Sequence, residues 1–132
     1  MTKATVIVPK EETEQTCLFR WAQMLSYSTC KELRLLHAIP NGGLRSKSEA
    51  ARMKAAGVRK GVPDICLPVA RKGCHGMYIE LKRQKGGRIS PDQVTWMHEL
   101  TLQGYRCMVC RGWMEAAREI ADYMDIPAES VP

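Results

Sequence analysis

Three charged residues near the middle of the chain have the types and spacing of a hydrolytic metal centre. Glu80 and Lys82 lie in the apolar segment 78–82, and Asp64 lies in an earlier apolar segment. In a strand, Glu80 and Lys82 share one face because side chains alternate. If the two segments form a hairpin that turns near Gly73, Asp64 lies opposite Lys82 and close to Glu80. We therefore expect the three side chains to converge at one end of a sheet.

Two carboxylates with open coordination positions suit Mg²⁺ or Mn²⁺, which prefer oxygen ligands and retain water molecules. A neighbouring lysine can orient or help deprotonate an attacking water and offset the charge that develops during phosphodiester hydrolysis. The alternative is a solvated hairpin with a cross-strand salt bridge, which explains most isolated E-x-K patterns. Asp64, placed at a suitable hairpin distance, favours the metal centre over the salt bridge.

Apolar periodicity, turn residues and helix-capping residues predict the elements that position these groups. In chain order they are a helix at 11–29, a strand at 33–39, a helix from Ser46 or Ser48 to Ala56, strands at 63–69 and 77–82, a helix at 91–103, a strand at 105–110 and a helix at 112–123. The fold class is therefore α/β, with a mixed sheet of about four strands flanked by helices. We expect one domain over residues 1–132, with a core at about 11–124 and a tail at 125–132.

The composition permits a polyanionic partner without demanding one. Lys and Arg number 20 against 14 Asp and Glu, which gives a formal net charge of +6. No run approaches the roughly 20 apolar residues of a membrane-spanning helix, and the N-terminal apolar run is too short for a signal peptide. We therefore expect a soluble, cytoplasmic protein with no membrane partner.

Six cysteines are scattered along the chain, and four of them lie inside apolar segments. This distribution predicts free thiols in a reducing compartment. Cys107 and Cys110 form a CxxC pattern, so a redox or zinc protein is an alternative. It is disfavoured because a structural zinc needs four ligands and strand alternation directs these two thiols to opposite faces.

Several segments together resemble the VRR-NUC branch of the PD-(D/E)XK nuclease superfamily. They are Ala-Ile-Pro-Asn-Gly-Gly at 38–43, Gly-Val-Arg-Lys-Gly-Val-Pro-Asp at 57–64, the segment 76–82, and Ser90-Pro91-Asp92-Gln93 followed by Trp96. With the first helix included, the resemblance covers about residues 11 to 124. It implies a restriction-endonuclease-like fold and a DNA endonuclease that depends on Mg²⁺ or Mn²⁺.

The resemblance also implies roles for individual residues. Asp64 and Glu80 would bind the metal together with the backbone carbonyl of Leu81, and Lys82 would act on the attacking water.

Two further assignments by resemblance have simple structural alternatives. Glu14 matches an acid of the first helix that the family places near the metal, but an acid at a helix start also stabilises the helix dipole. Gln93 matches a catalytic-motif glutamine of the family, but the first turn of a helix also accommodates a merely solvated side chain.

Stand-alone VRR-NUC proteins of this size are often phage-encoded and resemble junction resolvases, which implies a homodimer that cuts branched DNA such as a Holliday junction. A catalytically silent nucleic-acid-binding module of the same fold is the alternative function. Polar residues on loops or on a basic helix near the motif are candidate DNA contacts, although each is individually also explained as a solvated surface group. They are Asn41, Arg45, Arg52, Lys60, Arg83, Lys85 and Arg88.

Overall fold

A single mixed sheet forms the centre of the molecule in the computed structural model, which describes residues 7–40 and 46–132. Its strands β1 (His37–Ala38), β2 (Ile65–Leu67), β3 (Met77–Lys82) and β4 (Arg106–Arg111) are hydrogen-bonded in the order β1-β2-β3-β4. The pairs β1-β2 and β2-β3 are antiparallel, whereas β3 and β4 are parallel. The parallel pair needs a crossover connection, and a helix supplies it. The predicted α/β class and four-stranded mixed sheet are confirmed.

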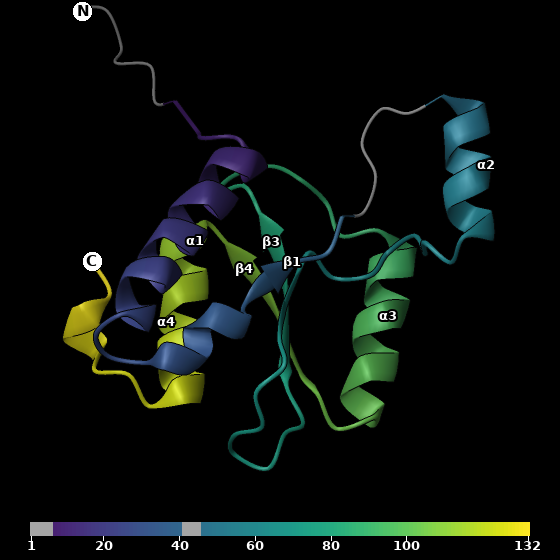
Figure 1. The fold of residues 1–132 in the computed structure, drawn as a ribbon. Coiled ribbons are helices and arrows are strands. Elements are labelled where there is room, and N and C mark those ends of the chain that lie inside the picture. The colour runs from purple at the N-terminus through teal and green to yellow at the C-terminus, as the bar shows by residue number, and fades with distance from the viewer. Residues whose placement is uncertain (1–6, 41–45) are drawn as a thin grey trace, which may run out of the picture.

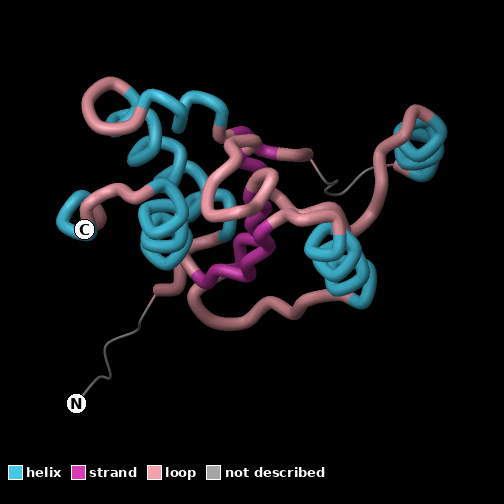
Figure 2. The backbone as a smooth tube through the Cα atoms, turned by 90° about the horizontal axis from the view of Figure 1, so that it is seen from below, coloured by secondary structure: helices cyan, strands magenta, loops and turns pink. Residues whose placement is uncertain are grey.

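Helices lie on both faces of this sheet. Helices α1 (Glu11–Ser26) and α4 (Trp113–Met124) cover one face, and α3 (Pro91–Leu102) lies on the other (Figures 1 and 2). Helix α2 (Lys47–Ala55) stands apart from the sheet and buries none of its side chains. Ser46, one of the two serines predicted as the cap, accepts a hydrogen bond from the backbone of Glu49 at 3.2 Å and so caps α2. Among the described residues, no helix has the length and apolarity that crossing a membrane requires.

The hydrophobic core lies between the sheet and the pair α1 and α4. Leu18 of α1, Ile79 and Leu81 of β3, and Ile120 of α4 are all essentially inaccessible to solvent. Because strand side chains alternate, the odd-numbered residues of β3 fill this core. Its even-numbered residues, which include Glu80 and Lys82, therefore face the side on which α3 lies.

The strand predicted at 33–39 is mostly wrong. Residues Lys31–Leu35 form a 3-10 helix, η1, and only His37–Ala38 pair as a strand. Leu33 and Leu36 are the buried leucines of this segment, and their spacing of three matches the 3-10 repeat rather than strand alternation.

The hairpin between β2 and β3 turns at Lys72 and Gly73, as predicted, but its strands do not pair in the predicted register. Lys72 and Gly73 both have positive φ angles, 50° and 76°, and the neighbouring Arg71 and Cys74 exchange two backbone hydrogen bonds of 3.2 and 2.8 Å. The first arm of the hairpin carries one extra residue. Between the Arg71–Cys74 bridge and the Leu67–Met77 pair, the three residues 68–70 lie opposite only two residues, 75–76. The register therefore extends to place Asp64 opposite Glu80, and the predicted pairing of Asp64 with Lys82 is wrong.

The C-terminal residues predicted as a tail pack against the body. Ile126 is buried, residues Ala128–Ser130 form a second 3-10 helix, η2, and the indole of Trp21 donates a 2.9 Å hydrogen bond to the carbonyl of Ser130. This segment thus closes one end of the core beside α1.

All six cysteines are free, as predicted. Cys110 is fully buried in the core, and burial raises the pKa of its thiol to about 12. Cys107 is only half-buried and lies on the opposite face of β4. These two thiols are therefore poorly suited to act as a redox or metal-binding pair.

Candidate metal centre

The three charged residues singled out from the sequence meet where β2 begins and β3 ends. Asp64 immediately precedes β2, and its Oδ2 accepts a 3.0 Å hydrogen bond from the backbone nitrogen of Leu81. Lys82 Nζ lies 3.4 Å from Glu80 Oε1. The predicted convergence of two carboxylates and one ammonium group is therefore present, with Glu80 in the middle.

The centre is largely shielded from water. Glu80 is 1% exposed and Lys82 is 7% exposed. Burial, followed by the negative charge of Asp64, raises the pKa of Glu80 to about 7. Burial also raises the pKa of Asp64, against the opposing effect of the hydrogen bond from Leu81. Two desolvated carboxyl groups that favour protonation are suited to exchange that proton for a cation.

One oxygen of this pair shows that the residues present fit a cation. Glu80 Oε2 is buried and has no hydrogen-bond partner among the residues that the structure describes. The Leu81 carbonyl projects toward the same strand edge as its N–H, which is the edge where Asp64 lies. Over residues 7–40 and 46–132, no group of three His, Cys, Asp or Glu side chains is placed to hold a metal. The candidate donors are therefore two carboxylates and one carbonyl, oxygen ligands of the kind that Mg²⁺ and Mn²⁺ prefer.

Gln93 connects the start of α3 to this centre. Its Oε1 accepts a 2.8 Å hydrogen bond from the Ser90 backbone, and its own backbone donates to Ser90 Oγ at 3.2 Å, which forms a complete capping box. Its Nε2 is consequently directed at Glu80 Oε1, to which it donates at 2.6 Å. Gln93 thus touches a candidate metal ligand and orients it, which is more than the solvated helix position that was the alternative.

Glu14 is buried and hydrogen-bonded at both of its carboxylate oxygens. It is 2% exposed, and its Oε1 accepts a 3.0 Å hydrogen bond from Gln84 Nε2. Its Oε2 accepts a short hydrogen bond from the backbone nitrogen of Trp113, the first residue of α4. Glu14 therefore caps α4 from α1, with one hydrogen bond on each of its carboxylate oxygens. The capping alternative is the one that the geometry favours, with the cap on another helix.

Glu11 is another acid of the first helix whose charge bears on the centre, and the sequence reasoning did not single it out. Glu11 is exposed at the first position of α1, and its negative charge contributes to the raised pKa of Asp64. The available signal was its position, one helical turn before Glu14.

The candidate DNA contacts differ in their surroundings. Arg83 is half-buried and donates a 3.2 Å hydrogen bond to the backbone carbonyl of Val8, so it holds the segment before α1. The Nζ atom of Lys60 lies 3.7 Å from Oδ2 of Asp92, a residue in the first turn of α3. Four of the candidates, Arg52, Lys60, Lys85 and Arg88, are exposed to solvent. Asn41 and Arg45 fall outside the described residues.

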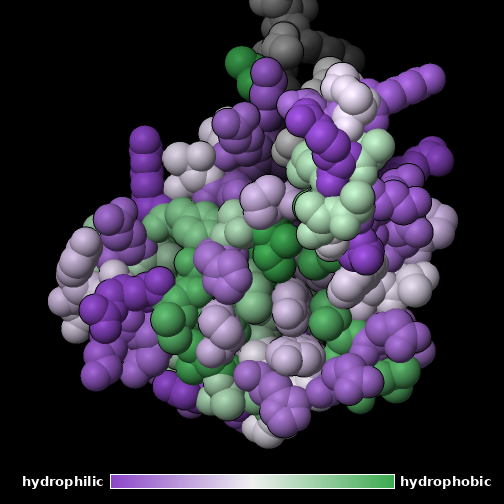
Figure 3. Space-filling model, turned by 45° about the vertical axis from the view of Figure 1, so that its right-hand side comes forward, coloured by the Kyte–Doolittle hydropathy of each residue, from purple (hydrophilic) through white to green (hydrophobic). Residues whose placement is uncertain are grey.

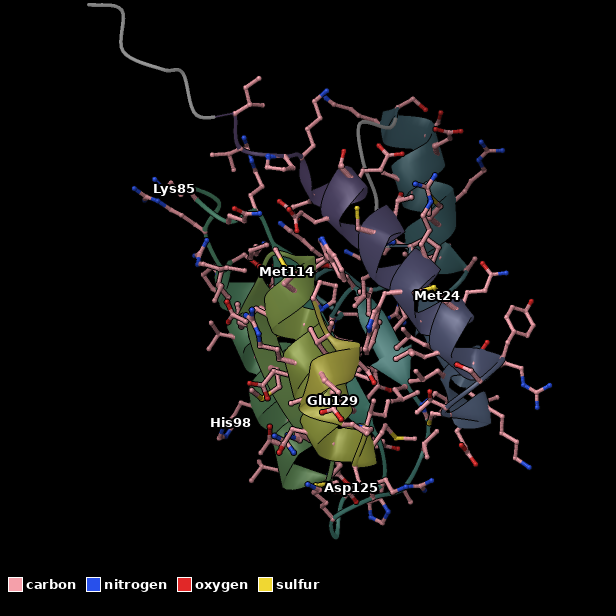
Figure 4. All side chains as sticks on the ribbon, turned by 90° about the vertical axis from the view of Figure 1, so that its left-hand side faces the viewer. Met24, Lys85, His98, Met114, Asp125 and Glu129 are labelled. Carbon is pink, nitrogen blue, oxygen red and sulfur yellow. The ribbon has the colours of Figure 1, made fainter. Side chains whose placement is uncertain are left out.

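The molecular surface is largely hydrophilic on the face shown in Figure 3. On the face shown in Figure 3, hydrophilic side chains surround a central hydrophobic patch. Lys85 extends away from the body at the end of the molecule where α1 begins (Figure 4). Exposed cations thus frame the end of the sheet that carries the centre.

Comparison with known proteins agrees with this geometry. The family model of the VRR-NUC domain matches residues 3–114. A solved structure described as a "VRR_NUC domain protein" is 26% identical, with a TM-score of 0.78, over 92% of this chain and 93% of that chain. No curated protein matches the chain. With 112 of its 132 residues matched by the family model and this fold around the Asp64, Glu80 and Lys82 cluster, the chain belongs to the VRR-NUC family of nuclease domains.

Proposed function

We propose that this nuclease domain is a Mg²⁺- or Mn²⁺-dependent endonuclease that hydrolyses phosphodiester bonds in DNA. The observation that carries the proposal is the buried pair Asp64 and Glu80 beside Lys82, with Glu80 Oε2 left without a hydrogen-bond donor among the described residues. A buried carboxylate oxygen without a partner is costly unless a proton or a cation satisfies it.

The chain's own residues would prepare this site for hydrolysis. The Leu81 amide fixes Asp64, and the Gln93 amide fixes Glu80, so both carboxylates are oriented before a metal arrives. A bound divalent cation would polarise the scissile phosphate and supply a water of lowered pKa. Lys82, held beside Glu80, is placed to orient that water and to offset the charge that grows on the phosphate oxygens.

Cations outside the centre would hold the DNA backbone. The segment 46–60 carries five basic residues against the single acid Glu49, and α2 within it buries no side chain. Arg52 and Lys60 therefore present their charges to solvent, where phosphates can reach them. We propose these residues, together with Asn41, Arg45, Lys85 and Arg88, as backbone contacts.

The finer substrate preference and assembly are also part of the proposal. Branched DNA such as a Holliday junction would be the preferred substrate, and a homodimer would place two centres for paired incisions. Arg83 is better assigned to holding the segment before α1, because its side chain is already bonded to Val8.

Cleavage of labelled flap, four-way junction and duplex DNA by the purified protein tests the proposal. With Mg²⁺ or Mn²⁺ we expect cleavage that disappears in Asp64→Ala and persists in Glu99→Ala, which removes an exposed acid from α3. Calorimetry should show a Mn²⁺ site that is lost only in Asp64→Ala. If no substrate is cut and no Mn²⁺ binds, the chain is the silent nucleic-acid-binding module and the proposal is wrong.

A further inference from the structure

The loop that connects β3 to α3 is held in place by one side chain from β4. Arg111 Nη1 donates to the carbonyl of Gly86 at 2.6 Å and to that of Arg83 at 3.4 Å. Its Nη2 donates to the carbonyl of Gly87 at 3.3 Å. Arg111 is the direct strand partner of Lys82 in the parallel pair, so this clamp lies beside the centre.

The conformation of the clamped loop directs two backbone N–H donors away from Arg111. Gly86 and Gly87 have φ angles of 79° and 70°, which residues with a Cβ rarely adopt. In a trans peptide the carbonyl of one residue and the N–H of the next point in opposite directions. Because the carbonyls of Gly86 and Gly87 point at Arg111, the N–H groups of Gly87 and Arg88 point away from it.

Cationic side chains surround these outward N–H groups. Lys85 and Arg88 are exposed, and neither forms an ion pair among the described residues. A Cβ added to Gly87 would lie 3.7 Å from Lys82 Cδ, so the loop packs directly against the lysine of the centre. Outward amides flanked by two cations form a binding environment for an anion such as a phosphodiester.

We infer that residues 85–88 form a phosphate-binding loop for the nucleic-acid strand that enters the centre, and that Arg111 is its positioning residue. This inference rests on the proposed function for the identity of the anion. Arg111 donates three bonds to the loop and would act through it, whereas Lys85 and Arg88 would contact the phosphates. The loop would therefore contribute to substrate binding more than to the hydrolytic step.

The test compares Arg111→Ala and Arg111→Lys with Arg118→Ala. Arg118 is also exposed and lines the same surface hollow as Arg111, so its removal subtracts one positive charge without releasing the loop. The dissociation constant for labelled duplex DNA is measured by anisotropy in EDTA, and KM and kcat are measured with Mn²⁺. Hydrogen exchange of residues 85–88 and thermal unfolding report the state of the loop and the fold.

For Arg111→Ala we expect the dissociation constant and KM to rise about tenfold, with kcat changed by less than about threefold. Arg111→Lys should behave like the alanine variant, because an ammonium group cannot bridge the three carbonyls. Lys85→Ala should weaken binding in the parent but not in the Arg111→Ala background, since the two residues act as one unit. Arg118→Ala should bind DNA as the parent does.

Several results would overturn the inference. Parental DNA affinity in Arg111→Ala, full rescue by Arg111→Lys, or additive effects of Arg111→Ala and Lys85→Ala would each show that the loop is not positioned for binding. If Arg111→Ala fails to fold, the Arg111→Lys and Lys85→Ala variants give the same decision. Because binding is measured in EDTA, the loop is tested even if the parent proves to cut no DNA.

Discussion

Replacing Gln93 by glutamate separates its two structural roles. In the parent, Gln93 Oε1 accepts from the Ser90 backbone at 2.8 Å, while Nε2 donates to Glu80 Oε1 at 2.6 Å. A glutamate can still complete the capping box, because that role requires only an acceptor. It cannot donate to Glu80 when it is ionised, so the variant places a second carboxylate oxygen against Glu80.

The expected loss can be worked out from this contact. A hydrogen bond to a charged group contributes about 1.5–3 kcal/mol, which corresponds to about a tenfold to hundredfold change in an equilibrium constant. The donor from Gln93 stabilises ionised Glu80, whereas the new carboxylate opposes ionisation. We therefore expect Gln93→Glu to lower Mn²⁺ affinity by about tenfold to hundredfold and to shift the cleavage pH profile toward higher pH.

Mn²⁺ titration calorimetry and a pH profile of cleavage measure these effects. The matched control is Ser90→Ala, which removes the hydroxyl cap of α3 but leaves the amide of Gln93 donating to Glu80. The control should lose about 1 kcal/mol of stability and keep its Mn²⁺ affinity. The reasoning is refuted if Gln93→Glu binds Mn²⁺ as tightly as the parent, or if Ser90→Ala weakens binding equally.

Further predictions concern single groups. The pKa of Glu80 near 7 means that Mn²⁺ affinity should rise about tenfold per pH unit below 7 and level off above it. Metal-free protein should lose stability as the pH rises from 4.5 to 7, because folded Glu80 holds its proton more tightly than the unfolded chain does. Glu14→Ala should cost about 1–3 kcal/mol of stability in urea unfolding, whereas Glu11→Ala should leave stability unchanged and weaken Mn²⁺ binding about two- to fivefold. Lys82→Ala should lower kcat by at least about 10²-fold while DNA binding and folding persist. Arg52→Ala should weaken DNA binding on every sequence and reduce the slope of log affinity against log salt by about one.

Specific outcomes would contradict these predictions. Mn²⁺ affinity that is flat from pH 5 to pH 8 would contradict the role of the raised pKa of Glu80. If Glu14→Ala lost Mn²⁺ binding without losing stability, Glu14 would be a metal ligand rather than a helix cap. Near-normal cleavage by Lys82→Ala would remove the lysine from the reaction, and an unchanged salt slope would remove Arg52 from the DNA contacts.

Local signals in the sequence were sufficient where one short segment determines its own structure. Ser90 as the N-cap and Pro91 at the first helical position marked the start of α3, and the alternation through Glu80 and Lys82 marked β3 and its two faces. The prediction of a strand at 33–39 failed because apolar residues spaced by three are as compatible with a short 3-10 helix as with a strand.

Contacts between distant segments could not be read from local patterns. Glu14 and Trp113 are 99 positions apart, so only the packing of α1 against α4 shows that the first-helix acid is a cap. The hydrogen bonds that Arg111 donates to the loop could not be predicted either, because they depend on β4 lying parallel to β3. Long-range register and side-chain orientation are properties of the assembled sheet, whereas the sequence pattern reports the preferences of each element.

The extra residue at 68–70 fixes which side of β2 carries the chemistry. An arm of the same length that paired without a bulge would leave the turn at Lys72 and Gly73 intact but move β2 by one position against β3. Since a one-position slip exchanges the two faces of a strand, Asp64 would point into the packed layer beneath α1 and α4, and Ile65 would emerge beside Glu80. Deleting one of residues 68–70 should therefore remove the bulge and still keep Asp64 opposite Glu80.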